Sequence, residues 1–283
     1  MTPGRRAAVL GSPIGHSLSP VLHRAAYDAL GLAGWTYDAY DVDAAGLPGF
    51  LAGLDDSWAG LSLTMPLKAA VLPLLDNVTP TVEAVGGANT VLLENGRRTG
   101  DNTDVPGILD ALNGTGLTSV SWAAVLGGGA TARAAVHALG ALTDRVTVHL
   151  RDPQRDPGRR AGLHRAAEPA GTALALQPWT AAPEALRAPL VVATTVAGAT
   201  DDLADHVPDR PGLLFDVLYD PWPTALAAAW TARGGRVVDG LDLLVHQAAR
   251  QVVLMTGTPV GPGELVPVLR AAGEAALRAR PKG

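Results

Sequence analysis

The sequence predicts a two-domain α/β protein whose second domain is a Rossmann-like, doubly wound parallel sheet. Short apolar runs alternate with helical patterns along most of the chain, and this alternation is typical of α/β folds. A continuous apolar strand at 122–126 leads directly into Gly127-Gly-Gly-Ala-Thr-Ala132, an alanine-rich helix to Leu142 and a second strand at 145–150. A glycine-rich turn between a strand and a helix indicates a dinucleotide-binding βαβ unit.

Composition narrows the classes of partner. The chain has 283 residues, of which 47% are hydrophobic and 17% charged, and this supports a substantial buried core. The net charge of -5, without a long run of Lys or Arg, disfavours nucleic acid and anionic membranes as partners. We expect a small-molecule ligand instead.

The cysteine count and the histidine spacing bear on metal and location. With no cysteine, disulfides, thiolate catalysis and Cys-based zinc sites are excluded. The seven histidines do not show a metal-ligand spacing, so we predict no metal. We see no signal-peptide core and no apolar stretch of about 18 residues, so we expect a cytoplasmic protein.

The first helix offers an anion site at its start. A short strand at 7–10 is followed by Ser19 as a natural N-cap and Pro20 as a natural first helical residue, with Gly31 as the stop. Free backbone N–H groups at this end make Ser17 and Ser19 candidates for binding a carboxylate or phosphate. The alternative is that Ser19 only caps its own helix and Ser17 lies in a loop.

A lysine and an aspartate further along form a candidate catalytic pair. Strands are expected at 36–42 and 61–63, helices at 44–54 and 79–85, and a hairpin from 88 around the turn Asn95-Gly96. Pro66 fits the first turn of a helix, which places Lys68 near the positive end of a helix dipole, where a cation is mildly disfavoured. Asp104 is the second residue of this candidate pair. The alternative is a solvated helix lysine and an N-cap aspartate.

The glycine turn predicts how a dinucleotide is held. Gly127 allows the tight turn, Gly129 the close approach of a pyrophosphate, and Ala132 the close packing of helix on strand. After the second strand, Arg151 and Arg155 favour a 2′-phosphate and hence NADP, whereas Asp152 keeps NAD as an alternative. We interpret Arg159 and Arg160 as part of a solvated polar loop.

Later strands end in polar residues that line the same edge of an open sheet. Strands at 190–193, 213–217 and 236–238 make Thr195, Tyr219 and Gly240 candidates for the nicotinamide half of the site. Helices at 241–255 and 263–280 are long enough to cross back onto the first domain. We therefore expect a first domain of 1–104 completed by 241–283, and a dinucleotide domain of 105–240.

Six motifs follow one another along the chain: the serine segment Gly11–Pro20, the lysine segment Gly60–Lys68, Ala88–Thr90, Asn102–Asp104, the glycine loop Gly127–Arg133 and the closing segment Gly240–Gln247. In this order they resemble the motifs of the shikimate dehydrogenase family, which includes quinate/shikimate dehydrogenases, and the resemblance runs nearly the whole chain. Three departures occur: Ser62-Leu63 replaces an Asn-Val pair, Leu243-Leu244 replaces a pair that begins with Met, and Leu150-Arg-Asp152 replaces the Asn-Arg-Ser/Thr of NADP-using members.

The resemblance implies an N-terminal substrate domain, an NAD(P)-binding domain and reversible, NADP-dependent reduction of 3-dehydroshikimate to shikimate in aromatic amino acid biosynthesis. It implies that Lys68 transfers the proton and that Asp104 orients both Lys68 and the substrate. The implied substrate residues are Ser17, Ser19, Thr64, Asn89, Thr103, Tyr219 and Gln247. The cofactor residues are Gly127, Gly128, Gly129, Ala130, Thr131, Arg151, Arg155, Thr194, Thr195, Val217 and Gly240.

Other functions stay open at this point. A quinate/shikimate or aminoshikimate dehydrogenase that uses NAD would share the fold and the pair Lys68 and Asp104. A catalytically silent NAD(P)-binding regulator is a more remote alternative, and an unrelated dinucleotide-binding protein a third. We expect a monomer or a homodimer.

Overall fold

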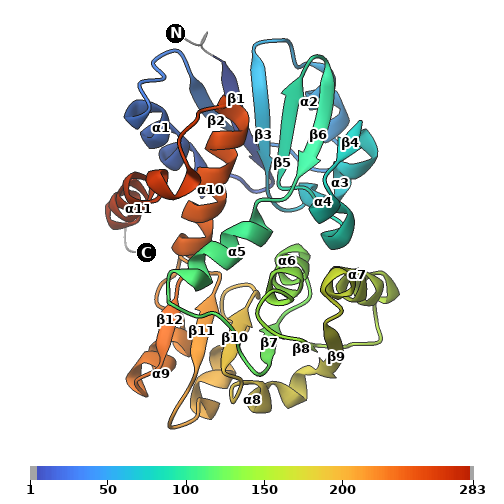
Figure 1. The fold of residues 1–283 in the computed structure, drawn as a ribbon, viewed down its shortest axis with the longest axis vertical. Coiled ribbons are helices and arrows are strands. Elements are labelled where there is room, and N and C mark those ends of the chain that lie inside the picture. Colours follow the sequence, from blue (N-terminus) through green and yellow to red (C-terminus); the bar gives the residue numbers. More distant parts are fainter. Residues whose placement is uncertain (1–4, 281–283) are drawn as a thin grey trace. The chain divides into compact units, whose positions relative to one another are not determined.

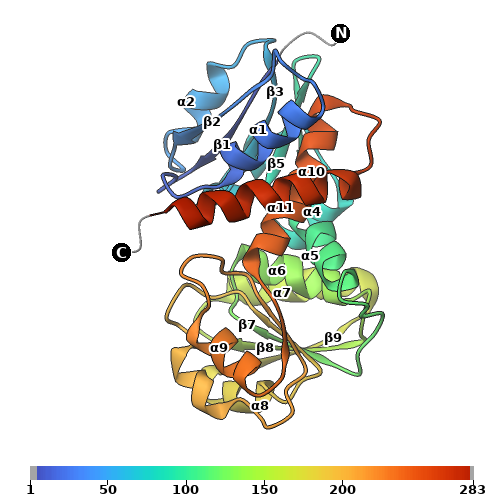
Figure 2. The same ribbon diagram turned by 90° about the vertical axis from the view of Figure 1, so that its left-hand side faces the viewer.

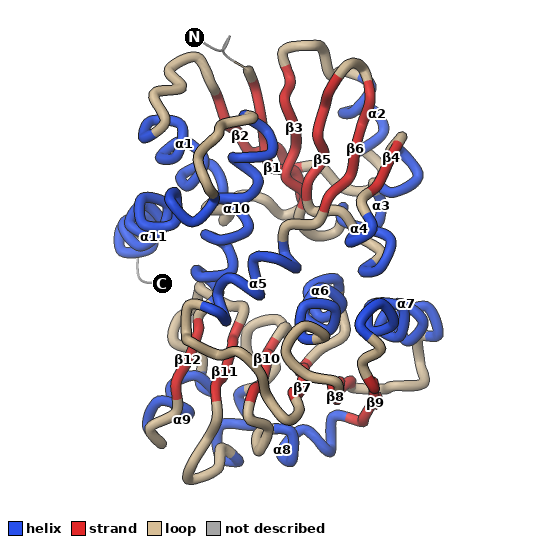
Figure 3. Tube along the Cα trace, viewed as in Figure 1, coloured by secondary structure: helices blue, strands red, loops and turns tan. Residues whose placement is uncertain are grey.

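The computed structural model describes residues 5–280 and divides into two compact units. Unit 1 takes the chain up to Glu83, then Gly87–Thr103, and then the residues from Leu244 onward. Unit 2 takes Ala84–Gly86 and Asp104–Leu243. Each unit contains one six-stranded sheet (Figure 1; strands in red in Figure 3). Both are mixed α/β layers, as the sequence predicts.

The sheet of unit 1 has the order β2-β1-β3-β5-β6-β4. Strand β1 pairs in parallel with β2 and β3, whereas β5 pairs antiparallel with both β3 and β6. The hairpin predicted around Asn95-Gly96 is confirmed, because both residues have positive φ angles of 53° and 72°, as a type I′ turn requires. The strands are β1 Arg6–Gly11, β2 Thr36–Asp41, β3 Trp58–Leu63, β4 Asn77–Val78, β5 Thr90–Glu94 and β6 Arg97–Asp101.

Helices cover both faces of this sheet. Alternate side chains of β3 point to opposite faces, so Leu61 and Leu63 join the apolar cluster with α2, α3 and α4, while Ser62 faces α10. Helix α1 packs against α11 on that second face (Figure 2). The helices are α1 Ser19–Ala29, α2 Leu47–Ala52, α3 Leu67–Ala70, the 3-10 turn η1 Leu72–Leu74, α4 Pro80–Val85, α10 Gly240–Thr256 and α11 Pro262–Ala279.

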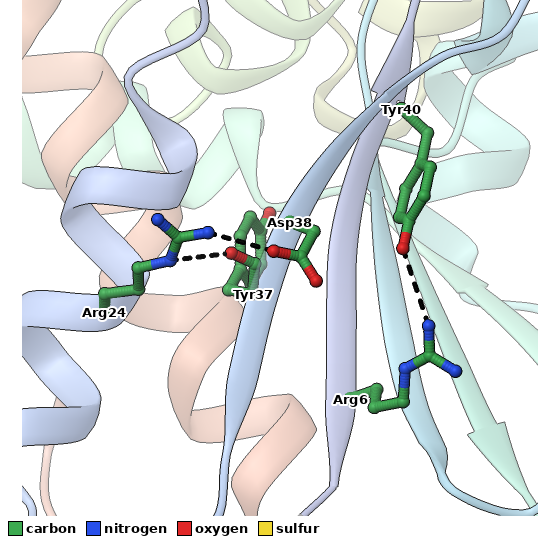
Figure 4. A network of polar contacts seen from close by, with 5 residues as sticks. All are labelled: Arg6, Arg24, Tyr37, Asp38 and Tyr40. Carbon is green, nitrogen blue, oxygen red and sulfur yellow. Dashed lines mark hydrogen bonds and ion pairs between the residues drawn. The ribbon is translucent and has the colours of Figure 1, made fainter.

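The first helix is also tied to the edge strand β2. Arg24 on α1 donates from Nε to the Tyr37 carbonyl at 2.9 Å and from Nη2 to Asp38 Oδ1 at 2.9 Å (Figure 4). On the neighbouring strand, Arg6 Nη2 lies 3.5 Å from the Tyr40 hydroxyl. These contacts hold Tyr37 in place on β2, and its side chain points into the core of unit 1.

Unit 2 is a doubly wound sheet of the order β12-β11-β10-β7-β8-β9, with every neighbouring pair parallel. The order runs outward on both sides of β7, and this is the strand order of dinucleotide-binding folds. The strands are β7 Ala123–Leu126, β8 Arg145–Leu150, β9 Ala173–Pro178, β10 Leu190–Ala193, β11 Leu213–Asp216 and β12 Arg236–Val238.

Two apolar layers cover the faces of the second sheet. Val125 and Phe215 pack with α5, α6 and α7, while Leu126 and Leu214 pack with α8, α9 and η4. Central strands that are buried on both faces read as continuous apolar runs, as here. The helices are α5 Asp104–Asn113, α6 Ala130–Leu139, α7 Pro157–Ala167, η2 Glu168–Ala170, η3 Trp179–Ala181, α8 Ala182–Ala185, η4 Asp201–His206 and α9 Ala225–Ala232.

Two sequence predictions about local structure are wrong. The N-cap of α1 is Leu18 and not Ser19, which is already helical. Arg159 and Arg160 lie in α7 and not in a loop, because Asp156 caps that helix by accepting the Arg159 amide hydrogen at 2.9 Å. Among the helices of residues 5–280, none is both long and apolar enough to cross a membrane.

Candidate active site

The start of α1 holds the two serines predicted to bind an anion. The Ser17 amide donates to the Ile14 carbonyl at 2.9 Å, and the Ser17 hydroxyl oxygen accepts the Ser19 amide hydrogen at 3.3 Å. Ser17 is half-buried and Ser19 is buried. Ser17 lies in the loop before α1, as the alternative expected, and its side chain satisfies an amide at the helix start.

The lysine lies in a single helical turn. Helix α3 contains four residues, its N-cap is Pro66, and the Leu67 amide donates to the Thr64 carbonyl at 2.8 Å. So short a helix has a small dipole. The Lys68 carbonyl accepts the Ala88 amide hydrogen at 2.8 Å, which fixes its backbone beside the approach to β5. Lys68 is half-buried and has polar partners.

Three predicted substrate residues meet within unit 1. The Thr103 amide donates to Asn89 Oδ1 at 2.8 Å, and Asn89 Nδ2 lies 3.0 Å from Thr103 Oγ1 and 3.4 Å from Gln247 Oε1. Gln247 Nε2 in turn donates to the Leu244 carbonyl at 2.9 Å. All three side chains are buried. Segments far apart in the sequence thus present a compact set of amide and hydroxyl groups, which suits a polyhydroxylated ligand.

The aspartate of the candidate pair belongs to unit 2. Asp104 is the first residue of α5, where a carboxylate is favoured by the helix dipole, and it is 5% exposed. It has polar partners as well. Because Asp104 is itself the first helical residue, it is not the N-cap that the structural alternative expected.

The glycine loop is tightly packed at Gly127 and Gly128 and leads directly into the start of α6. Gly127 has φ +113°, and an added Cβ would lie 2.6 Å from Thr194 Oγ1, so any larger residue is excluded. A Cβ added to Gly128 would lie 2.4 Å from Leu150 Cδ2 and 2.9 Å from Arg159 Cδ. Gly129 is the N-cap of α6 and offers no side chain to its first-turn amides. The amides of Ala130 and Thr131 thus begin a helix that can receive an anion.

Arginines gather beside this loop. Burial lowers the pKa of Arg133, and the positive charges of Arg165 and Arg159 lower it further, which places the three guanidinium groups near one another. Arg133 donates to the Val85 carbonyl at 2.6 Å. Arg151 and Arg155 are exposed. Several cationic side chains of unit 2 thus lie on the segments next to the glycine loop.

Asp152 is engaged within its own loop. Its Oδ1 accepts the amide hydrogens of Gln154 at 2.9 Å and Arg155 at 3.2 Å. This is the local side-chain-to-backbone pattern that stabilises turns. Asp152 therefore has a structural use that does not involve a ribose hydroxyl.

The ends of the central strands carry the remaining cofactor candidates. The Thr194 amide and hydroxyl both donate to the Leu126 carbonyl, at 2.8 and 3.0 Å. The Val217 amide donates to the Ala193 carbonyl at 3.0 Å, and an added Cβ on Gly240 would collide with the Val217 carbonyl. Thr195 and Tyr219 are half-buried at the same edge of the sheet. The structure thus brings these candidates together at the carboxyl ends of the strands.

Comparison with known proteins places the chain in a family. Residues 9–91 match the shikimate dehydrogenase substrate binding domain. The chain is 38% identical to the shikimate dehydrogenase (NADP(+)) of Thermus thermophilus over 89% of its own length and 92% of the relative. The chain belongs to the shikimate dehydrogenase family. Its resemblance to that family, predicted from six motifs, is confirmed.

Solved structures of the shikimate dehydrogenase family share the fold. A Mycobacterium tuberculosis shikimate dehydrogenase is 38% identical with a TM-score of 0.84, covering 94% of this chain and 99% of that one. A Thermus thermophilus enzyme solved in complex with NADP(H) and shikimate is 36% identical with a TM-score of 0.80, covering 95% and 99%. The predicted fold class, a substrate domain plus a Rossmann-like domain, is confirmed.

Sequence reasoning missed three buried polar residues of the shikimate dehydrogenase fold in unit 1, namely Tyr37, Ser62 and Gln251. A signal was present, since Ser62 interrupts the apolar strand β3 and Gln251 follows Gln247 by one helical turn on α10. Among residues 5–280, no group of His, Asp and Glu side chains is arranged to hold a metal ion.

Proposed function

We propose that this chain catalyses the reversible NADP(H)-dependent reduction of 3-dehydroshikimate to shikimate, a step of aromatic amino acid biosynthesis. The observation that carries this proposal is the buried cluster of Asn89, Thr103 and Gln247, three amide and hydroxyl side chains brought together from segments that the family uses for its substrate. The Thermus thermophilus relative solved with NADP(H) and shikimate supports the same pair of ligands.

The substrate residues have distinct roles. Ser17 and Ser19 hold the carboxylate of the substrate at the start of α1, where hydroxyl donors suit an anion. Asn89, Thr103 and Gln247 bind ring hydroxyls. Thr64 and Tyr219 complete the substrate contacts. These roles follow from the chemistry of each side chain and its place in its own unit.

The residues of unit 2 fit NADP. The glycine loop Gly127–Thr131 receives the pyrophosphate, and Arg151 with Arg155 receives the 2′-phosphate. Thr194, Thr195, Val217 and Gly240 lie toward the nicotinamide. When bound, the nicotinamide supplies or accepts the hydride.

Lys68 and Asp104 carry the proton chemistry. During reduction, Lys68 gives a proton to the substrate oxygen as negative charge develops on it, and during oxidation it takes the proton back. Asp104 orients the amine and the substrate oxygen. The protein thus contributes position and one proton, and water is not needed in the step.

The test is the substitution Lys68→Met, which keeps the length of the side chain and removes the amine. We expect kcat to fall by about a hundredfold to ten-thousandfold, with a smaller change in KM, because a positioned acid acts mainly in the transition state. The exposed Arg97 of β6 supplies a control, since Arg97→Met removes a cation from the same unit without a role in the site. A near-normal kcat for Lys68→Met would refute the role of Lys68.

A further inference from the structure

We propose that Gln251 is a positioning residue that helps to hold the Asn89 carboxamide in the orientation that faces the substrate; this rests on the proposed function of Asn89. An asparagine offers two donors on one side and an acceptor on the other, so its orientation decides which partner it can bind. That orientation is set by the Thr103 amide together with a directed chain of buried hydrogen bonds, which runs from Tyr37 through Ser62, Gln251 and Thr90.

The orientation of the Asn89 carboxamide, at the end of this series of hydrogen bonds, is unambiguous. Its Oδ1 accepts the Thr103 amide hydrogen at 2.8 Å, and a backbone N–H can only donate. The Thr90 hydroxyl also donates to Asn89 Oδ1, at 2.8 Å. The Nδ2 group therefore donates on its other side, to Thr103 Oγ1 at 3.0 Å and to Gln247 Oε1 at 3.4 Å. The contact with Gln247 is long for a hydrogen bond, so it is the one that a ring hydroxyl of the substrate would replace.

Gln251 sets the direction of the Thr90 hydroxyl. Gln251 Nε2 donates to the Asn89 carbonyl at 3.1 Å and to Thr90 Oγ1 at 2.9 Å. A carbonyl oxygen can only accept, so this end of Gln251 must be its NH2 group. Since Thr90 Oγ1 accepts from Gln251, its own single proton is free to be donated to Asn89.

The other end of Gln251 is fixed in the same way. The Ser62 hydroxyl donates to Gln251 Oε1 at 2.8 Å and accepts from the Tyr37 hydroxyl at 2.6 Å. Burial raises the pKa of Tyr37 well above its usual range, against the opposing hydrogen bonds of the Ser62 and Ser19 side chains, so the phenol keeps its proton and donates. Every proton in the chain therefore points from Tyr37 toward Asn89.

Burial makes this direction costly to reverse. Gln251 is 1% exposed, Thr90 and Tyr37 are fully buried, and Ser62 and Asn89 are 4% and 2% exposed. Turning one of these side chains around would place two acceptors or two donors opposite each other in the core, where no water can replace the lost hydrogen bond. Without the Gln251 amide, the Thr90 hydroxyl can turn away from Asn89 Oδ1, which leaves that oxygen held by the Thr103 amide and loosens the orientation in which Asn89 presents its donors to the substrate hydroxyl.

The substitution Gln251→Met keeps the volume of the side chain and removes both polar ends. We expect the KM for shikimate to rise by about tenfold, the effect of one weakened hydrogen bond, with a smaller change in kcat and an unchanged KM for NADP. Thr256 gives a matched control, because it lies on the same helix and its hydroxyl donates to the Val252 carbonyl at 2.8 Å outside the chain. Thr256→Val should leave the KM for shikimate unchanged.

A double variant separates this inference from the proposed function. If Gln251 acts through Asn89, then Asn89→Ala and the double variant Gln251→Met/Asn89→Ala should have the same KM for shikimate. If the increases in KM for shikimate of the two single variants multiply in the double variant, the inference is overturned. A normal KM in Asn89→Ala would overturn the substrate role of Asn89 itself, whereas a raised KM there and a normal KM in Gln251→Met would overturn only the positioning role.

Thr90 supplies the test if Gln251→Met does not fold. Thr90→Val removes the relaying hydroxyl at constant shape, and Thr90→Ser keeps it. We expect a raised KM for shikimate in the valine variant and its recovery in the serine variant. A Thr90→Val enzyme with a normal KM would contradict the inference.

Discussion

At the scale of single residues, His23 is a buried base whose protonation the fold opposes. Its ring stacks on Tyr37 with centroids 3.8 Å apart, and Nδ1 donates to the Ser19 carbonyl at 2.9 Å. Within the described residues Nε2 has no hydrogen-bond partner. Burial lowers the pKa of His23 from 6.5 to about 4, against the opposing hydrogen bond to Ser19. The ring is therefore neutral near pH 7.

We expect this histidine to make the protein sensitive to acid. Between pH 6.5 and pH 4 the unfolded chain binds a proton at His23 that the folded chain does not, so the free energy of unfolding falls as the pH falls, by about 3 kcal/mol in total. Above pH 6.5 this contribution is fully present. Denaturant titrations at pH 7, 5.5 and 4.5 measure it.

The substitution His23→Phe keeps an aromatic ring in the stack and cannot be protonated. The free energy of unfolding of this variant should fall less steeply over the same pH range, whatever its value at pH 7. Equal slopes for the two proteins would show that His23 is not the group responsible.

At the scale of elements, we expect the loop after β8 to decide the choice of cofactor. Arg151 is exposed, whereas Asp152 accepts two amide hydrogens of its own turn. Arg151→Ala should therefore raise the KM for NADP by about tenfold or more, because a charge-assisted hydrogen bond to the 2′-phosphate is lost. The KM for NAD, which lacks this phosphate, should not change. Steady-state kinetics with each cofactor at fixed shikimate measures both constants.

Asp152→Asn serves as the matched control, because its side-chain oxygen can accept the same two amide hydrogens. We expect its KM values for NADP and NAD to stay near those of the parent enzyme. A large rise in the KM for NAD would mean that the carboxylate binds a ribose hydroxyl instead.

Local patterns predicted most of the elements but not all of them. The dinucleotide-binding motif could be predicted because adjacent residues specify each of its parts, which are β7, the glycine loop, α6 and β8. Helix α7 was missed because its arginine-rich sequence lacks an apolar stripe, although Asp156 and Pro157 form a recognisable helix start. The alternation of alanine and leucine in β9 was a second neglected signal.

Long-range contacts limited the prediction of the site. Family motifs named Asn89, Thr103 and Gln247, and the structure brings these three together. The bond between Ser62 and Gln251 joins residues 189 positions apart, and neither residue type indicates its partner. Such a pair becomes visible only when the packing of α10 on β3 is known.

At the scale of the whole molecule, the predicted ligands belong to different units. We expect hydrogen–deuterium exchange with NADP alone to slow the amides of the glycine loop, residues 127–131, in unit 2. Shikimate alone should slow those around residues 17–19 and 89 in unit 1. Ligand binding near a hundred times Kd stabilises the folded state by about 2.7 kcal/mol, which suffices for a measurable change.

The reverse pattern, with NADP slowing only the amides of unit 1, would contradict the assignment of the two sites. An unrelated nucleotide such as GTP is a suitable control ligand, because it carries phosphates but no nicotinamide. The cytoplasmic location and the monomeric or dimeric state expected from the sequence stay predictions.

The path of the chain through the two units has a consequence for its synthesis. The strands of unit 2 all lie within the continuous segment Asp104–Leu243, whereas unit 1 is interrupted by that segment and needs α10 and α11 from the end of the chain. A growing polypeptide that has reached Leu243 contains the whole cofactor sheet but lacks Gln247 and Gln251. On the ribosome, the nucleotide half can therefore fold first, and the substrate half is completed last.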